Sequence, residues 1–399
     1  MRVSTLILLL GAAAAVMPAM AAASKASPAC VPAARWLIPG AAPAAISTAA
    51  VMERIQGSQV VLLGEIHDNR EHHRWQLMML AALKGRNPDL VIGLEMFPRR
   101  VQPALDRWVA GELTEAEFLK QSEWNKVWRF DPSLYMPLFE FARMNRVPMV
   151  ALNVEQSLIR DVGRDGLAGI DESRREGVTR PAPARAGHLA RLRPVFEQHK
   201  KDGHGLAGAA SGDEEAQFKR FVETQQVWDR GMAQRIAEAL VKYPGATVAG
   251  IMGSGHVAYG DGVAHQLQDL DVHRVASLLP WDEDRECDEL AAAGIADAVF
   301  RVPAPPRAEA AADRPRLGVW LEPAAGGVRI RQVVKDSVAD AAGLREGDVV
   351  VEIAGRQARE SGDVSAAVQR QAPGTWLPIT VRRGEETLEV VAKFPPPAQ

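Results

Sequence analysis

The sequence has little cysteine and no excess of charge of one sign. Its 399 residues contain two cysteines, which excludes a small fold held together by a disulfide framework. Lys and Arg total 47 against 50 Asp and Glu, a formal net charge of −3, so no overall positive field would draw the protein to nucleic acid. We therefore expect no nucleic-acid partner. The length and the 47% of hydrophobic residues predict at least two globular domains.

Apolar runs of membrane-spanning length are also missing. The apolar run from Leu6 to Val16 is shorter than the roughly 20 residues that a spanning helix needs. It follows Arg2 and precedes Ala19-Met20-Ala21, the small-x-small pattern of a signal-peptidase site. We predict that residues 1–21 are a cleaved export signal and that residues 22–44 form a flexible leader. The mature protein would then be periplasmic and have no transmembrane segment.

The two cysteines, Cys30 and Cys287, leave two alternatives open. They could pair in an oxidising compartment, or both could be unpaired residues without a role. Their separation in the sequence says nothing about their distance in space, so the sequence does not decide between the two.

Residues 45–300 alternate short apolar runs with longer helical patterns. This alternation is typical of βαβ units, and runs that are apolar almost throughout indicate strands covered by helices on both faces. The pattern predicts an α/β fold with a mostly parallel sheet flanked by helices. Strands are expected at residues 60–64, 90–95, 147–153, 247–253 and 272–278, and helices at residues 69–84, 114–122, 133–144 and 213–241. The pair Asp68 and Glu71 resembles a capping box at the start of the first helix.

The pattern loosens in two later segments. Residues 163–212 contain three prolines and a stretch rich in Gly and Ala from residue 203, which predicts an inserted helical arm with a mobile loop. Residues 301–315 are rich in Pro, Ala and Arg, which is typical of a linker. A second, β-rich domain is expected at residues 316–395.

This second domain resembles a PDZ domain of the kind attached to bacterial periplasmic proteases. The resemblance rests on Arg316-Leu317-Gly318-Val319 and on the run Ala342-Gly343-Leu344-Arg345-Glu346-Gly347-Asp348. It implies that the loop at Leu317, Gly318 and Val319 binds the terminal carboxylate of a polypeptide while the peptide extends a sheet edge. A folded cap without a ligand is the alternative.

Polar residues follow the predicted strands of the first domain. The first strand leads into Glu65 and His67, and the others lead into Glu95, Asn153 and His256. Ligands of open parallel sheets bind beyond the carboxyl ends of the strands. If the strands are parallel and adjacent, these side chains converge on one edge of the sheet.

The two histidines, His67 and His256, occupy matching positions three residues after a glycine, in Gly64-Glu65-Ile66-His67 and Gly253-Ser254-Gly255-His256. Together with Glu65 and Glu95 they could bind a divalent metal ion or transfer protons, depending on distances that the sequence does not reveal. For the metal ion we expect His67, Glu95 and His256 as ligands.

Further candidates surround this group. A tyrosine phenolate can bind ferric haem, and two of the three tyrosines lie near the predicted site. Histidines also lie in the first predicted helix and in the arm. Those in the arm could reach over the site or simply be solvated. The candidate haem ligands are Tyr259, Tyr135, His72, His73, His199 and His204.

These motifs together resemble the ChaN family of haem-binding, iron-regulated bacterial proteins, within the Tiki and erythromycin-esterase-like superfamily. The resemblance covers about residues 46–279 and rests on residues 61–69 with His72-His73, on 93–97, on 226–233 and on 253–260. The shared elements of the superfamily are two Gly-x-x-His motifs and an intervening Glu, which correspond here to His67, His256 and Glu95.

The resemblance implies alternative functions. ChaN-like proteins bind haem against the face of a homodimer and serve in iron acquisition or envelope haem handling. Tiki-like relatives are metal-dependent proteases and esterase-like relatives are hydrolases, in which Glu65, His67, Glu95 and His256 would be catalytic. The chain departs from ChaN in lacking a lipoprotein cysteine and in carrying the PDZ-like tail. A third alternative is an envelope scaffold that works through its PDZ groove alone.

Overall fold

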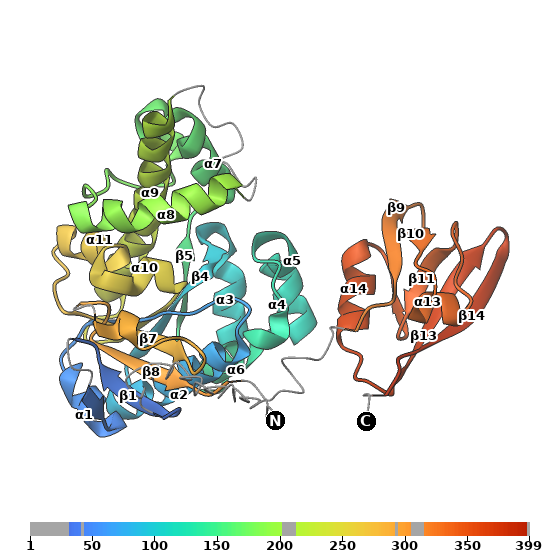
Figure 1. The fold of residues 1–399 in the computed structure, drawn as a ribbon, viewed down its shortest axis with the longest axis horizontal. Helices are drawn as coiled ribbons and strands as arrows, with labels where there is room; N and C mark the ends of the chain where they lie inside the picture. The colour runs from blue at the N-terminus through green and yellow to red at the C-terminus, as the bar shows by residue number, and fades with distance from the viewer. Residues whose placement is uncertain (1–31, 41–43, 202–212, 292–293, 305–314, 397–399) are drawn as a thin grey trace, which may run out of the picture.

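The structure, a computed structural model, describes residues 32–40, 44–201, 213–291, 294–304 and 315–396. Within these residues, eight strands form one sheet in the order β2-β1-β8-β7-β3-β6-β4-β5 (Figure 1). The six strands from β8 to β5 are parallel to one another, whereas β1 pairs antiparallel with both of its neighbours, β8 and β2. The strands are β1 (Arg35–Ile38), β2 (Ala44–Ile46), β3 (Val60–Leu63), β4 (Leu90–Pro98), β5 (Met149–Asn153), β6 (Thr247–Ile251), β7 (Val275–Asp282) and β8 (Ala298–Val302).

Helices cover both faces of this sheet. They are α1 (Thr48–Arg54), α2 (Arg70–Arg86), α3 (Gln102–Val109), α4 (Glu115–Gln121), α5 (Trp124–Val127), α6 (Met136–Met144), α7 (Gln156–Asp165), α8 (Ala186–Lys201), α9 (Glu214–Lys242), α10 (Ser254–Val257) and α11 (Val263–Asp269). The mixed α/β fold with flanking helices predicted from the sequence is confirmed, and each of the five expected strands overlaps a strand of the sheet.

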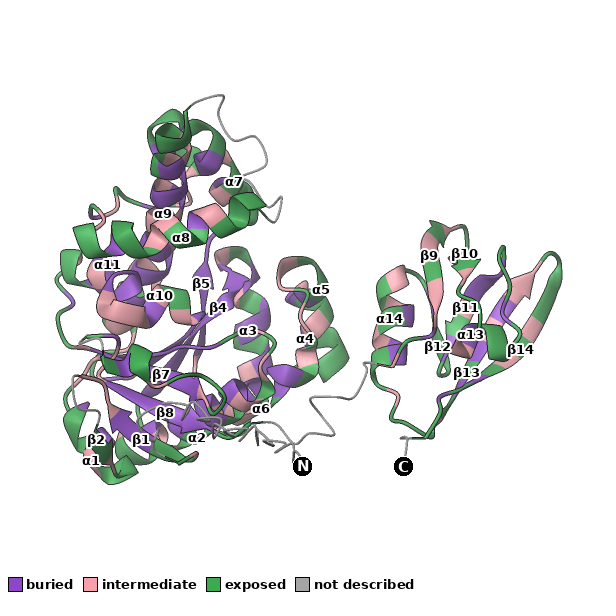
Figure 2. Cartoon of the chain, in the orientation of Figure 1, coloured by how far each residue is buried: buried purple, intermediate pink, exposed green. Residues whose placement is uncertain are grey.

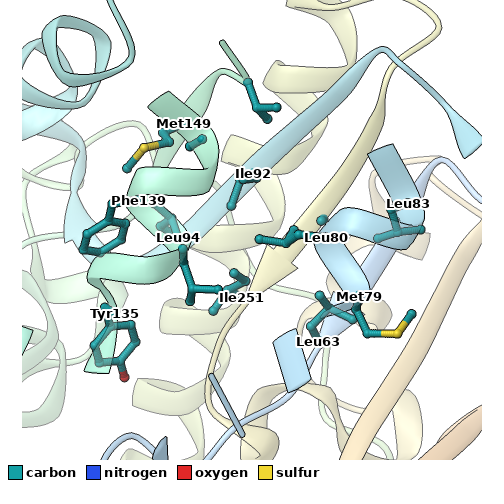
Figure 3. Packing of buried hydrophobic residues seen from close by; sticks show 14 of the residues in the cluster. Leu63, Met79, Leu80, Leu83, Ile92, Leu94, Tyr135, Phe139, Met149 and Ile251 are labelled. Carbon is teal, nitrogen blue, oxygen red and sulfur yellow. The ribbon is translucent and has the colours of Figure 1, made fainter. Parts of the chain in front are cut away.

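The alternation of side chains along β3 explains how helices cover both faces. Val61 and Leu63 belong to a core that α2, α3 and α6 cover, whereas Val60 and Leu62 belong to a second core with α9 and α11. Figure 3 shows side chains of α2 meeting those of the central strands, and Figure 2 shows the strands buried between exposed helix surfaces. Burial on both faces is why these strands are apolar almost throughout.

The start of the domain differs from the flexible leader expected for residues 22–44. Residues 35–38 form β1, which pairs with β8, and residue 44 begins β2. Trp36 and Leu37 are buried, and the Trp36 ring packs edge-on against Phe300. The Ala- and Pro-rich composition around this short apolar run hid the strand. The predicted signal segment and Cys30 lie outside the described residues, whereas Cys287 is disulfide-bonded.

The helix after β3 begins one residue later than the expected capping box. Its N-cap is Asn69, whose side-chain oxygen accepts hydrogen bonds from the amides of Glu71 and His72. The predicted arm contains α8, which packs against the long helix α9, while residues 202–212 lie outside the described residues. None of the described helices combines the length and the apolar character needed to cross a membrane.

Residues after the predicted linker form a second, antiparallel sheet. Its strand order is β14-β13-β11-β10-β9, and β12 pairs with β11. The elements are β9 (Val319–Ala324), β10 (Gly327–Val333), α13 (Val338–Ala341), β11 (Val349–Ile353), β12 (Arg356–Gln357), α14 (Ser361–Gln369), β13 (Trp376–Arg383) and β14 (Glu386–Lys393). The strand β9 lies at the edge of this sheet and contacts α14.

Candidate functional site

Three adjacent strands bring the predicted residues together. Because β6 lies between β3 and β4, the segments that leave these strands meet at one edge of the sheet. Glu65 and His67 follow β3, His256 follows β6 in α10, and Glu95 lies in β4 directly after its pairing with β6 ends. The four residues expected to share a site therefore do so in the structure.

Glu65 is the centre of the first half of the site. It is fully buried, and its Oε1 lies 2.9 Å from Nδ1 of His67 and accepts a 2.6 Å hydrogen bond from the hydroxyl of Tyr135. The other carboxylate oxygen, Oε2, lies 3.2 Å from Nε2 of the buried His73. The carboxylate thus fixes the orientation of the His67 ring.

Glu95 and Asp229 form the second half of the site around His256. Oδ1 of Asp229 lies 2.6 Å from Nδ1 of His256, while Oε1 of Glu95 lies 3.5 Å from Nε2 on the opposite side of the ring. Glu95 Oε2 accepts a 2.7 Å hydrogen bond from the amide of Gly253. Asn153 donates a 2.8 Å hydrogen bond to the backbone carbonyl of Glu95 and so holds the strand at this point.

The two halves share one arrangement. Each histidine has its Nδ1 beside a buried carboxylate, Glu65 for His67 and Asp229 for His256. Nε2 of His256 lies 3.5 Å from Glu95, and Gly253 lies between the halves: a Cβ on it would be 3.5 Å from Nε2 of His67 and 3.7 Å from Oε2 of Glu95. Such a carboxylate behind Nδ1 orients an imidazole for metal binding or proton transfer at Nε2.

The charges of the site follow from this geometry. Burial alone would lower the pKa of His256, but the charges of Glu95 and Asp229 outweigh it and raise the pKa to about 10. Burial would raise the pKa of Glu65, but the hydrogen bond with His67 and the nearby imidazole of His73 lower it to about 2. At neutral pH His256 is therefore a cation and Glu65 an anion.

The pKa values of His67 and Glu95 also move in the direction that favours the charged form. Burial opposes the charged form of His67, yet the hydrogen bond to Glu65 and the charge of Glu95 raise its pKa above 6.5. The pKa of Glu95 is lowered because the charge of His256 outweighs the effect of burial. Both shifts favour the charged forms of the two side chains.

His67 and Glu95 also line a pocket of about 500 Å³. The ring of His67 packs against Trp128 at 4.6 Å and Phe130 at 5.4 Å between centroids, and Trp228 lies on the side of His256 at 5.4 Å. The side chain of His67 is 32% exposed, whereas that of His256 is 13% exposed. His67 is the histidine among the residues that line this pocket.

Three of the candidate haem ligands lie behind this site. Tyr135 is buried and its hydroxyl donates to Glu65, so it orients that carboxylate. Burial and the charge of Glu65 raise the pKa of Tyr135, which disfavours the phenolate that iron binds. His72 is buried too, with Nε2 2.9 Å from Asp282 and Nδ1 accepting from the amide of Ile66. His73 is buried beside Glu65. In this structure these side chains support the site from within the core.

Two further candidates, Tyr259 and His199, are not among the residues that line the pocket. Tyr259 is half-buried, has a φ of 61°, and lies under the guanidinium of Arg191 at 4.0 Å. His199 is exposed on α8, where its Nδ1 lies 2.8 Å from the carbonyl of Val195. His204 lies outside the described residues.

For the predicted metal site, the structure brings His67, Glu95 and His256 together. Among the described residues, however, no group of three or more His, Cys, Asp or Glu is arranged to hold a metal ion. The divalent metal remains a prediction.

Sequence reasoning missed Asp229 and the aromatic walls. Asp229 lies in the middle of α9, where its single carboxylate carries no signal of a contact with His256. Trp128, Phe130 and Trp228 read as ordinary core residues. Trp228 and Asp229 do belong to the family-like motif at residues 226–233, which indicates a functional residue on this helix but not its partner.

The residues expected to bind a peptide lie at the start of the edge strand β9. Leu317 is buried, Gly318 has a φ of 83°, and Val319 begins the strand. A Cβ on Gly318 would lie 2.3 Å from the Cβ of Ser337, so a side chain does not fit there.

Family models match both domains of the chain. A model of the family described as haem-binding uptake, Tiki superfamily, ChaN matches residues 51–267, more than half of the chain, and a PDZ domain model matches residues 315–393. In solved structures, ChaN of Campylobacter jejuni, described with cofacial haem, is 19% identical with a TM-score of 0.48, covering 66% of this chain and 95% of that one.

Two curated relatives match parts of the chain. Protein RETICULATA-RELATED 5, chloroplastic, of Arabidopsis thaliana is 25% identical over 219 residues, and serine protease HTRA1 of Xenopus tropicalis is 39% identical over 64 residues. The matches cover 53% and 16% of this chain, and only 29% and 14% of those proteins. From the family match at residues 51–267, the chain belongs to the haem-binding uptake family of the Tiki superfamily, ChaN, and it carries a PDZ domain at residues 315–393.

Proposed function

We propose that this protein binds haem in the pocket at the edge of the parallel sheet, with the imidazole of His67 as a ligand of the iron. The observation that carries the proposal is the partly exposed ring of His67, held by Glu65 and lining a pocket of about 500 Å³. Membership of a family described as haem-binding supports it.

The residues of the pocket fit a haem. With Nδ1 donating to Glu65, neutral His67 keeps the lone pair of Nε2, and among the described residues this nitrogen has no hydrogen-bond partner. Trp128, Phe130 and Trp228 supply flat apolar surface, and the volume is within the range of pockets for small ligands and cofactors. When bound, haem would supply an iron whose redox state and ligand affinity depend on this imidazole.

The proposal extends to where the protein works. We propose export through the signal segment at residues 1–21, a periplasmic location, and a role in iron acquisition or envelope haem handling, with a homodimer as the working form.

A titration with hemin tests the haem proposal. The wild-type protein is expected to give a Soret band that saturates at one haem per chain, and His67→Ala is expected to weaken it. His199→Ala is the matched control, because His199 is an exposed imidazole on α8. Tyr259→Phe tests the alternative ligand. The absence of a Soret band, or its loss in Tyr259→Phe but not in His67→Ala, would contradict the proposed site.

For the PDZ domain we propose recognition of polypeptide C-termini by Leu317, Gly318 and Val319. Among the described strands, β9 pairs with β10 alone, so its other edge, beside α14, can receive a further strand. A peptide with a free C-terminus is expected to bind the full chain, and its C-terminally amidated form to bind much more weakly. Equal binding of the two peptides would contradict this role.

A second candidate function is hydrolysis of an ester or peptide. The observation that favours it is the pair of histidines, each with a carboxylate at Nδ1, together with Glu95 3.5 Å from Nε2 of His256. Protonated His256 could act as a general acid and Glu95 as a general base toward a water molecule. In the metal-dependent form, His67, Glu95 and His256 would hold a divalent ion and Glu65 would orient His67.

Assays on ester and peptide substrates separate this candidate from haem binding. Turnover should be lost in Glu95→Gln and His256→Ala and, for the metal-dependent form, after chelation. Turnover that survives both substitutions would remove the candidate.

A further inference from the structure

The lining of the pocket proposed for haem has an excess of basic side chains. Four basic residues line it together with two acidic ones: Arg100, Lys126, Arg129, Arg160, Glu95 and Glu155. The two acidic residues do not neutralise all four basic ones, because each already has its own partners. Glu95 accepts from the amide of Gly253 and faces His256, and Glu155 pairs with Arg100.

Ion pairs account for two of the four basic residues. Arg100 pairs with Glu123 as well as with Glu155, and Lys126 lies 2.9 Å from the same Glu123. Among the described residues, neither Arg129 nor Arg160 has an ion-pair partner. Two exposed guanidinium groups therefore line one pocket without a counter-charge.

The backbone around them favours an anion too. Arg160 lies on the ten-residue helix α7, whose first residues, Gln156 and Ser157, line the same pocket. Among the described residues no side chain caps this helix end, and the amide of Leu158 already bonds the carbonyl of Glu155, which leaves the amides of Gln156 and Ser157 to an anion. Arg129 has a φ of 68°, a costly backbone conformation for a residue with a side chain, and stands between Trp128 and Phe130, which hold His67.

We propose that Arg129, Arg160 and the start of α7 form a carboxylate subsite of this pocket. This inference rests on the proposed haem function and specifies the ligand: a planar apolar body against Trp128 and Phe130 with a carboxylate toward the two arginines. The propionate groups of haem have this chemistry. Guanidinium groups bind carboxylates through two parallel hydrogen bonds, which makes the subsite a determinant of ligand orientation.

The test compares hemin with its dimethyl ester, in which both carboxylates are masked. Wild-type protein should bind hemin about tenfold more tightly than the ester, since a charge-assisted pair contributes on this order. Arg129→Gln combined with Arg160→Gln should remove most of this difference by weakening hemin alone. Arg54→Gln, an exposed arginine on α1, is the control and should leave the difference unchanged. Equal binding of hemin and ester by the wild type would overturn the subsite.

A second measurement separates the subsite from the haem proposal. The arginine Nε–H signals of isotope-labelled protein are followed by NMR during titration with benzoate and, as a neutral control, benzamide. Signals of Arg129 and Arg160 are expected to shift with benzoate only. If these signals shift but no hemin binds, the haem proposal fails and the carboxylate subsite stands. If neither signal shifts, the subsite is overturned, whatever hemin does.

Discussion

Asp229 Oδ1 lies 2.6 Å from His256 Nδ1, and this contact joins the long helix α9 to the segment that follows β6. Both side chains are shielded from solvent, with 4% of Asp229 and 13% of His256 exposed. The contact fixes the side of the imidazole that faces Glu95. A residue on a covering helix thus sets the chemistry of a residue at the sheet edge.

Replacing Asp229 by Asn should lower the pKa of His256 from about 10 toward its ordinary value of 6.5. Because that pKa is raised in the folded state, His256 stabilises the protein fully below pH 6.5 and loses this contribution as the pH rises through about 10. NMR titration of the imidazole measures the shift. Asp269→Asn, at an exposed carboxylate that pairs with Arg230, is the control and should leave His256 unchanged. An unaltered pKa in Asp229→Asn would contradict the assigned role.

Gly253→Ala should disturb the site without straining the backbone. Gly253 has φ −56° and ψ 140°, which alanine adopts readily, but its Cβ would lie 3.1 Å from Cε1 of His67. His67 must then move, and we expect haem binding to weaken about tenfold, equivalent to roughly 1.4 kcal/mol. Gly255→Ala is the matched control, since nothing lies within 4 Å of its Cβ position. Equal affinities of the two variants would argue against His67 as the ligand.

The PDZ domain should lose stability in acid through Asp348. Its carboxylate accepts two hydrogen bonds from Arg383, at 2.7 and 2.8 Å, which outweigh the effect of burial and lower its pKa below 3.8. A depressed pKa stabilises the fold above pH 3.8, and this contribution is lost as the pH falls. Asp348→Asn should cost about 2 kcal/mol at pH 7.

Hydrogen exchange of the amides in β11 and β13 of the full chain measures this effect. Protection should fall in Asp348→Asn at pH 7, and the variant should lose less than the wild type on acidification. Glu346→Gln, at an exposed neighbouring position, is the control. Equal protection of Asp348→Asn and the wild type at neutral pH would show that the pair contributes nothing.

The sequence predicts the part of the site that follows from sheet periodicity. His67, Glu95 and His256 each come after an apolar run, and parallel strands place the ends of such runs at one edge. Asp229 could not be located in this way, because its place depends on how α9 packs across the sheet. The role of Tyr135 depends likewise on tertiary packing: a tyrosine near the site reads as a ligand until its hydroxyl is seen bonded to Glu65.

The strand β1 marks a similar limit in the fold. Four residues with two buried side chains, Trp36 and Leu37, are too few to reveal a period within an Ala- and Pro-rich stretch. Their partner strand, β8, lies far along the chain, and the pairing of β1 with β8 follows from the apolar surface that the two strands bury. Arg129 could not be singled out from the sequence either, because its proposed role depends on its place in the pocket.

The most direct test of the account locates the haem through the tryptophans. Ferric haem broadens NMR signals of nearby protons, so the indole N–H signals of labelled tryptophans report its position, with a diamagnetic zinc porphyrin as reference. The account predicts that Trp128 and Trp228, which line the pocket, lose their signals first, while Trp320 and Trp376 of the PDZ domain keep theirs. Broadening that spares Trp128 and Trp228 would contradict haem binding beside His67.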